Sequence, residues 1–318
     1  MAGRMTGLLL RRLRDLLIIL VIVGTMMFFV IRLIPGDPAQ AILGPTARPA
    51  DVAALRSSMG LDGSLWQQYL SWAGHVLRGD FGTSITYHQP VLDVVAAHIV
   101  PTLTLAVLST VISFFLSVAI TAWQAVSPRN PVARGLDRLS SLGMAMPDFW
   151  ISLVLVLVFS VTLRWFPSSG YHDLLTDPVA AVPALVLPVT VLVIGQTALF
   201  VLTLRESVLG ELPLAYLRTA RVKGLPERRV LLKHVLPNAL MPLVTQLGSN
   251  FAMLVGGIVI IESIFVVPGL GHLLMGAVST RDFPLIQGVT LFVAVLFVVV
   301  NLLVDLSYAL LDPKVRVA

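Results

Sequence analysis

The sequence predicts an all-α integral membrane protein that crosses the bilayer about six times. The chain of 318 residues is 57% hydrophobic and only 12% charged, whereas soluble domains carry about 25% charged residues. Its mean hydropathy is +0.91. Continuous apolar runs are spread along the whole chain rather than gathered in one region. A chain with this composition has lipid as its main solvent.

Six apolar runs are long enough to cross a hydrocarbon core, which is about 30 Å thick and needs about 20 helical residues. They lack the alternating pattern of a membrane β-strand, so we expect helices. The predicted spans are residues 16–34, 99–126, 139–163, 183–204, 239–264 and 284–311. Because the first run exceeds the ~7–15 apolar residues of a signal peptide, we expect it to remain as an uncleaved span.

Lysine and arginine residues predict the orientation, because cytoplasmic connections carry an excess of them. Sixteen of the 22 fall on the side of the two termini. These sixteen are Arg4, Arg11, Arg12, Arg14, Arg129, Arg134, Arg138, Arg205, Arg218, Arg221, Lys223, Arg228, Arg229, Lys233, Lys314 and Arg316. We therefore predict that both termini are cytoplasmic.

The spans divide the chain into three parts. Residues 1–34 form the N-terminal tail and first span, residues 35–98 an extracytoplasmic helical segment, and residues 99–318 a core with spans two to six. In the middle part, Ser64 is a candidate N-cap for a helix over residues 65–78. The apolar face of this helix would carry Trp66, Tyr69, Leu70, Ala73 and Leu77. An amphipathic segment lying on lipid is the alternative interpretation.

The longest basic connection, residues 205–238, predicts two short helices at an angle. Pro213 suits the first turn of one helix, and Gly224 would end it. Pro226 would begin the second helix, with Glu227 near its positive end. A DNA-reading helix pair would have similar charge, but the short tether to the membrane argues against nucleic acid as a partner. Protein docking and contact with lipid headgroups are the other interpretations.

Catalytic and cofactor motifs are missing from the sequence. None of the three lysines, Lys223, Lys233 and Lys314, is followed by Ser or Thr, so the chain has no ATP-binding P-loop. No two histidines stand four residues apart, as a helical metalloprotease motif requires. The chain has no cysteine, which removes thiolate catalysis and thiolate metal sites. We expect no catalytic residue, metal site or cofactor in this chain.

Three acidic residues, Asp148, Glu262 and Asp305, lie in or near the apolar runs. Charge at membrane depth is costly, so each is a candidate for a pathway or gate. Structural roles remain as alternatives: Asp148 could cap a helix that restarts after Pro147, and Asp305 could bond a neighbouring helix. Glu262 could face water or a partner.

Several motifs carry a family resemblance. They are residues 33–39 (LIPGDPA), 60–62 (GLD), 79–84 (GDFGTS), 216–225 (YLRTARVKGL), 236–237 (LP), 267–271 (VPGLG), 281–284 (RDFP) and 301–305 (NLLVD). Through them the chain resembles the permease subunits of binding-protein-dependent ABC importers, in the dipeptide/oligopeptide/nickel branch. Residues 216–225 resemble the family's cytoplasmic E-A-A-x-x-x-G loop. Arg218 and Thr219 replace the usual Glu and Ala, as in the peptide branch.

This resemblance implies a type I importer permease fold in the cytoplasmic (inner) membrane. The implied partners are a second, homologous permease subunit in a heterodimer, two ATP-binding subunits or a fused pair, and an extracytoplasmic substrate-binding protein. ATP and magnesium would be bound by the ATPase subunits, so this chain would be non-catalytic. Coupling to the ATPase is expected from Tyr216, Leu217, Arg218, Thr219, Ala220, Arg221, Lys223, Gly224 and Leu225.

The implied cargo is a dipeptide or oligopeptide, with nickel, glutathione or haem-like compounds as alternatives. Two other classes are weaker hypotheses. A secondary, ion-coupled transporter fits poorly with one large basic loop and few intramembrane charges. An intramembrane enzyme lacks the necessary nucleophile and metal motifs.

Overall fold

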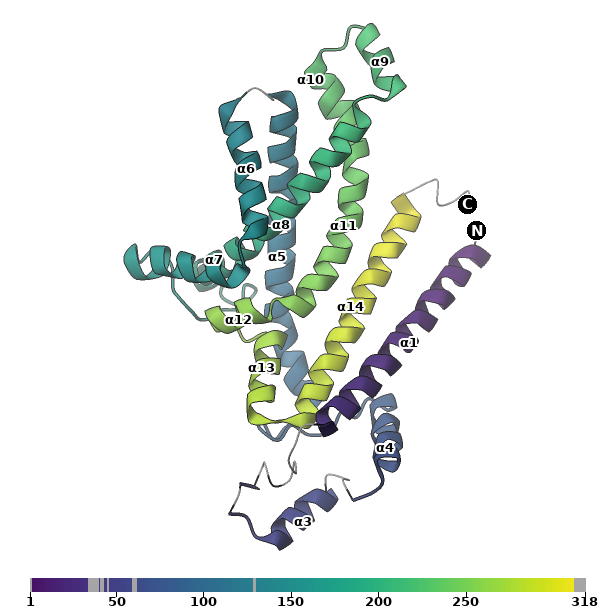
Figure 1. Cartoon of the computed structure of the whole chain (residues 1–318), viewed down its shortest axis with the longest axis vertical. Helices are drawn as coiled ribbons and strands as arrows, with labels where there is room; N and C mark the ends of the chain where they lie inside the picture. Colours follow the sequence, from purple (N-terminus) through teal and green to yellow (C-terminus); the bar gives the residue numbers. More distant parts are fainter. Residues whose placement is uncertain are drawn as a thin grey trace. The chain divides into compact units, whose positions relative to one another are not determined.

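In the computed structural model, residues 2–33, 40, 43–44, 46–58, 62–127 and 130–311 are described, and their regular structure is helical (Figure 1). The elements are α1 (Ala2–Leu33), α3 (Pro49–Ser58), α4 (Leu65–Leu77), α5 (Val91–Val126), α6 (Pro131–Ala145), α7 (Asp148–Leu155), η1 (Val156–Thr162), α8 (Pro178–Glu211), α9 (Ala215–Val222), α10 (Glu227–Val230), η2 (Leu231–Val235), α11 (Leu236–Gly257), α12 (Val259–Phe265), α13 (Leu270–Thr280) and α14 (Phe283–Leu311). The η elements are π-helical turns. This confirms the predicted all-α class.

Four helices in the described part of the chain are long and apolar enough to cross a membrane. They cover Val91–Val126, Pro178–Glu211, Glu227–Gly256 and Phe283–Leu303. The count becomes five if α12 and α13 together make one span. Shorter apolar helices cover Leu17–Val30 and Asp148–Thr162. The second, fourth and sixth predicted spans therefore lie inside long helices, and a total of about six stays a prediction.

The third predicted span, residues 139–163, is wrong as a single continuous helix. α6 ends at Ala145 and α7 begins at Asp148. The cause is Pro147, which lacks an N–H and drives the residue before it out of the helical region. Met146 accordingly has φ −92° and ψ 129°. α7 and η1 run across the direction of α6 rather than continuing it (Figure 1).

The fifth predicted span, residues 239–264, has different limits from those expected. The helix begins earlier, since α10, η2 and α11 follow one another without a break, and α11 ends at Gly257. Ile258 then separates α11 from α12. Two consecutive glycines, at positions 256 and 257, favour such an end because glycine gains little from helical structure.

The chain divides into two compact units, which are described separately. Unit 1 comprises Met1–Val100 and Pro268–Val299, and unit 2 comprises Pro101–Val267 and Val300–Ala318. α5 and α14 each contribute residues to both units.

In unit 1, α4 begins at the predicted N-cap. The Ser64 hydroxyl accepts a hydrogen bond from the Gln67 N–H, and the Gln67 side chain accepts one from the Ser64 N–H, which completes a capping box. Tyr69 bonds Thr25 of α1 at 2.8 Å, and Trp72 lies against Phe28. Trp66, Leu70 and Leu77, which belong to the predicted apolar face, remain exposed.

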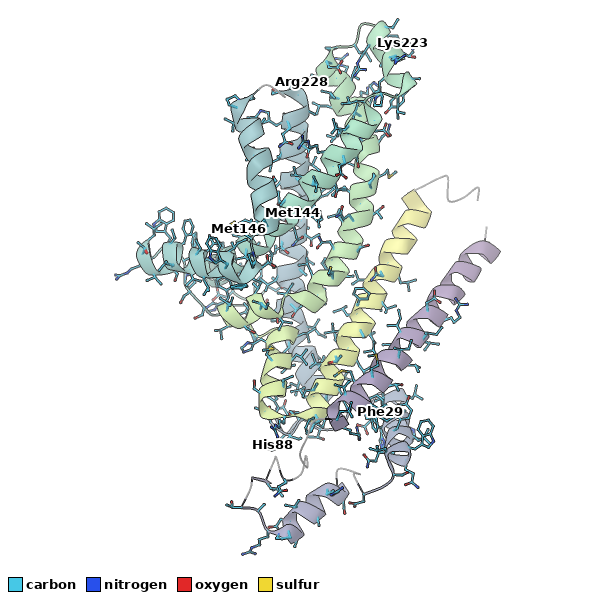
Figure 2. The ribbon with its side chains drawn as sticks, in the orientation of Figure 1. Phe29, His88, Met144, Met146, Lys223 and Arg228 are labelled. Carbon is cyan, nitrogen blue, oxygen red and sulfur yellow. The ribbon has the colours of Figure 1, made fainter. Side chains whose placement is uncertain are left out.

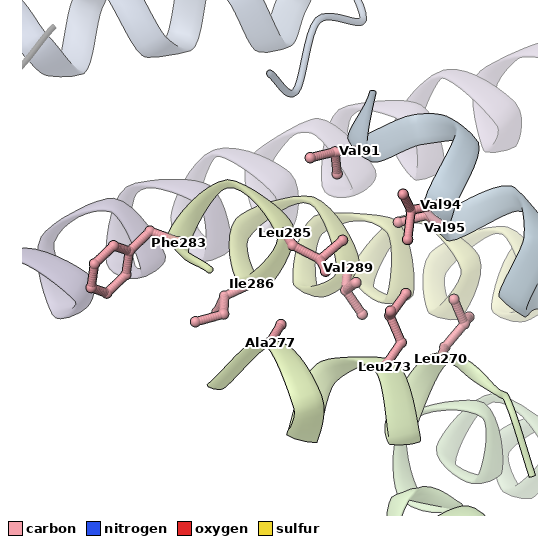
Figure 3. Packing of buried hydrophobic residues seen from close by; sticks show 10 residues of the cluster. All are labelled: Val91, Val94, Val95, Leu270, Leu273, Ala277, Phe283, Leu285, Ile286 and Val289. Carbon is pink, nitrogen blue, oxygen red and sulfur yellow. The ribbon is translucent and has the colours of Figure 1, made fainter. Parts of the chain in front are cut away.

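A buried cluster in unit 1 joins the start of α5 to α13 and α14 (Figure 3). Its members are Val91, Val94, Val95, Leu270, Leu273, Ala277, Phe283, Leu285, Ile286 and Val289. Gly288 is what allows α14 to approach α5 so closely. A Cβ at position 288 would lie 2.2 Å from the Cγ1 atom of Val91.

Beside this cluster lies a buried acid, Asp282, which we group with Ser84, Thr86 and Leu285 as the Asp282 cluster. One carboxylate oxygen of Asp282 accepts hydrogen bonds from the Ser84 hydroxyl at 2.6 Å and the Thr86 N–H at 2.9 Å. The other accepts the Leu285 N–H at 3.2 Å, in the first turn of α14. Asp282 is fully buried. The cluster thus fastens residues 79–84 to residues 281–284, two motifs far apart in the sequence.

In unit 2, α5 packs against α8 through small polar side chains. Gln196 of α8 donates to the Ser109 hydroxyl at 3.0 Å and accepts from the Thr110 hydroxyl at 3.3 Å. Ser113 and Ser117 are also buried on α5. Small residues at four-residue spacing let helix backbones approach closely in a membrane, and hydroxyl groups bond across the interface.

Candidate coupling site

Helix α9 carries most of the predicted coupling residues and is anchored to unit 2 by two side chains. Leu217 is fully buried and Ala220 is 9% exposed. They pack with Val208 of α8 and with Val230 and Val235 of α10 and η2. Ala220 faces the chain's own core, and its part in coupling to the ATPase stays a prediction. Its small size lets α9 lie close to α10.

The end of α9 confirms the predicted role of Gly224. Gly224 has φ +77°, a conformation that costs other L-residues about 1–2 kcal/mol. Its N–H bonds the Arg221 carbonyl at 2.9 Å, and the Leu225 N–H bonds the Ala220 carbonyl at 3.3 Å. This pair of bonds is a Schellman motif. Pro213, in contrast, precedes the N-cap Leu214 and lies outside the first turn of α9.

An ion pair holds α9 against α10 across this turn. The Arg221 guanidinium donates to both carboxylate oxygens of Glu227, at 3.0 and 2.7 Å. This guanidinium is therefore engaged within the chain, and its expected contact with an ATP-binding subunit stays a prediction. An exposed bidentate pair fixes geometry more than it adds stability.

A second polar network ties α9 to α8 and α11. The Tyr216 hydroxyl donates to the Glu211 carboxylate at 2.6 Å and accepts from the Asn238 amide at 3.0 Å. Asn238 also donates to the His234 carbonyl at 3.2 Å. Partial burial, followed by the bond to Glu211, raises the pKa of Tyr216. These bonds connect α9 to the end of α8 and the start of α11.

The remaining side chains of α9 point away from the core. Arg218, Thr219, Val222 and Lys223 are exposed, and Val222 is 88% exposed. Lys223 lies at the tip formed by α9 and α10, and Arg228 lies at the start of α10 (Figure 2). This tip combines a fixed backbone with accessible apolar and cationic groups, as a protein-docking element requires.

The three candidate pathway acids have different surroundings. Glu262 of α12 is fully buried and accepts a 2.6 Å hydrogen bond from the Thr102 hydroxyl of α5, so the interpretation of Glu262 as water-facing is wrong. Asp148 is exposed in the first turn of α7, where the N-cap is Pro147 and no side chain caps the helix. Asp148 is therefore not the expected cap. The side chain of Asp305 lies outside the described residues.

Two functional-site residues, Glu211 and Asn238, were missed by the sequence analysis, as was the pairing of Glu227 with Arg221. Tyr216 and Asn238 stand 22 residues apart, so no helical spacing brings them together. A search for metal-binding groups among the described residues finds no set of three His, Cys, Asp or Glu side chains.

Long apolar helices and an anchored polar tip are typical of a multi-spanning membrane protein. The model of the "binding-protein-dependent transport system inner membrane component" matches residues 117–317, and the model of its N-terminal part matches residues 5–106. The chain belongs to this family of ABC transporter permeases. Membership implies a membrane-embedded subunit that works within a larger transport complex.

Named relatives match along nearly their whole length. The chain is 38% identical to a "probable peptide ABC transporter permease protein" (y4tP) of Sinorhizobium fredii, covering 97% of this chain and 98% of that one. It is 36% identical to the "oligopeptide transport system permease protein AppB" of Bacillus subtilis, covering 98% and 100%. A crystal structure of an amino acid ABC transporter aligns with TM-score 0.53 and 18% identity, over 68% of this chain and 92% of that one. This likeness concerns the fold alone.

Proposed function

We propose that this chain is one of two permease subunits of an ATP-driven peptide importer, and that α9 is its coupling helix. The relatives named as peptide permeases support the cargo. The distribution of basic residues supports a cytoplasmic position for both termini and for α9. A substrate-binding protein would deliver the peptide, and two ATP-binding subunits, or a fused pair, would bind ATP and magnesium.

The observation that carries the coupling role is the combination of a fixed backbone with an exposed face. Leu217, the Arg221–Glu227 pair and the Tyr216 network hold α9 rigidly. Val222 and Lys223 stay accessible to a partner. When the ATP-binding subunits close, a rigid helix would pass their displacement to α8 and α11, and a flexible loop would absorb it.

Substitution of Gly224 tests this role in the assembled transporter. A Cβ at position 224 meets no atom within 4 Å, so we expect Gly224→Val to act mainly through backbone strain. A cost of about 1–2 kcal/mol predicts an import rate about 5- to 30-fold lower. Gly224→Asn should retain more import, because Asn tolerates this conformation better.

Gly210→Val is the matched control. Gly210 lies near the end of α8, and a Cβ there also meets no atom within 4 Å. Import of a radiolabelled oligopeptide into proteoliposomes should be normal for this variant, and the amount of each chain in the membrane should be equal. Wild-type import by Gly224→Val would contradict the coupling role of α9.

A further inference from the structure

A basic groove lies beside the coupling helix and is not used in the role proposed for α9. It is an open groove of about 670 Å³ formed by α10, η2 and the start of α11. Its lining residues are Pro226, Arg228, Arg229, Leu232, Lys233 and Pro237. Within the part of the chain that the structure describes, Arg228, Arg229 and Lys233 have no acidic partner. The groove thus presents three uncompensated cations next to apolar walls.

The position of the groove along the helix indicates where it sits in the bilayer. α11 has 22 residues and no charged side chain, which gives a length of about 33 Å and matches a hydrocarbon core of about 30 Å. Lys233 lies three residues before α11, and Arg229 lies seven before it, about 5 and 10 Å beyond the start of α11. The headgroup layer extends about 5–7 Å beyond the hydrocarbon core, so Lys233 lies within it, and the long side chain of Arg229 can reach back to it.

The chemistry of the groove fits a phosphodiester. Guanidinium and ammonium groups bind phosphate oxygens through charge-assisted hydrogen bonds. Leu232, which is 39% exposed between the basic residues, offers an apolar contact for the first atoms of an acyl chain. An acidic protein surface would pair with the cations, but it would leave the apolar wall at this depth without a matching contact.

We propose that the groove of Arg228, Arg229 and Lys233 binds the phosphate of an anionic phospholipid. The bound lipid would neutralise the groove and hold the base of the coupling loop at the membrane surface. Lipid binding at this site does not depend on ATP hydrolysis or on the identity of the cargo. The lipid site can therefore be tested separately from the proposed transport function.

Lipid retention by the purified full-length chain tests the proposal. The chain is equilibrated in detergent with phosphatidylglycerol or phosphatidylcholine, and bound lipid is measured by native mass spectrometry. Arg229→Gln/Lys233→Gln should bind phosphatidylglycerol about 30-fold more weakly, since each basic residue at an anionic surface accounts for a roughly fivefold change. Arg218→Gln/Lys223→Gln removes the same charge from α9, outside the groove, and should keep wild-type retention.

Two further arms complete the test. The charge-keeping exchange Arg229→Lys/Lys233→Arg should retain the lipid, which separates loss of binding from loss of folding. Millimolar inorganic phosphate should not displace phosphatidylglycerol; displacement would identify a free-phosphate site instead. The proposal would be overturned if the groove variant and the α9 variant lost equal amounts of bound phosphatidylglycerol, or if neither lost any. The groove variant can also be assembled with its ATP-binding subunits. If it then binds phosphatidylglycerol normally but retains an ATP-binding subunit less well, the proposal is overturned in favour of a protein partner.

Discussion

Asp282 in unit 1 and Glu227 in unit 2 are both carboxylates close to a helix start, yet the chain uses them in opposite ways. Asp282 is fully buried, and donors from Ser84, Thr86 and Leu285 satisfy it. Glu227 is exposed and bonds only the exposed edge of α9 through Arg221. The first arrangement fastens distant segments permanently. The second orients a surface that remains open to another chain.

The largest effect is expected from removing the buried carboxylate. Asp282→Ala leaves the buried Ser84 hydroxyl and the buried Leu285 N–H without their acceptor, at a cost of about 3 kcal/mol. We expect a clearly lower unfolding midpoint, followed through tryptophan fluorescence in one nanodisc composition. Asp282→Asn should lower the unfolding midpoint less, since the side-chain carbonyl of Asn can still accept a hydrogen bond.

Glu227→Gln is the matched control for this measurement. It removes the same charge at an exposed site, and such pairs contribute little to stability. Its unfolding midpoint should stay close to that of the unchanged chain. If Glu227→Gln lowered the unfolding midpoint more than Asp282→Ala, the proposed difference between the two carboxylates would be contradicted.

A smaller but more specific effect is expected at Gly288, which tests close packing around the Asp282 cluster. The added methyl group of Gly288→Ala would meet Val91, a buried β-branched residue that cannot turn away. Overpacking of this kind costs about 1–3 kcal/mol. Combining it with Val91→Ala should restore stability, because the second change vacates the same space.

Gly276→Ala serves as the control for this substitution. Gly276 lies on α13 of the same unit, and a Cβ there meets no atom within 4 Å. Alanine should therefore be neutral or slightly stabilising at this position. Equal destabilisation by Gly288→Ala and Gly276→Ala would show that the contact with Val91 does not cause the loss of stability.

Local signals in the sequence predicted much of this architecture. Ser64 followed by Gln67, Gly224 after a basic helix, and proline at position 147 each act on the backbone within a few residues. Their consequences could therefore be predicted without tertiary contacts. The break at Pro147 was anticipated as a restart, but its effect on the length of the third span was not.

What the sequence could not predict depends on contacts between distant segments. Asp282 and Ser84 are 198 residues apart, and no periodicity joins them. The burial of Ala220 could not be predicted either, because it depends on where Val230 and Val235 lie. The Tyr216 network has the same origin: its three elements meet only after α8 and α11 have packed.

The central claim, that the exposed side of α9 meets an ATP-binding subunit, can be tested by site-specific crosslinking. The chain has no cysteine, so an introduced cysteine is the single thiol of this chain. Val222→Cys, labelled with a photoreactive maleimide in the assembled transporter, should crosslink to the ATP-binding subunit. Leu77→Cys on α4, which is equally exposed at 87%, should not. Crosslinking of the ATP-binding subunit from position 77 and not from position 222 would contradict the account.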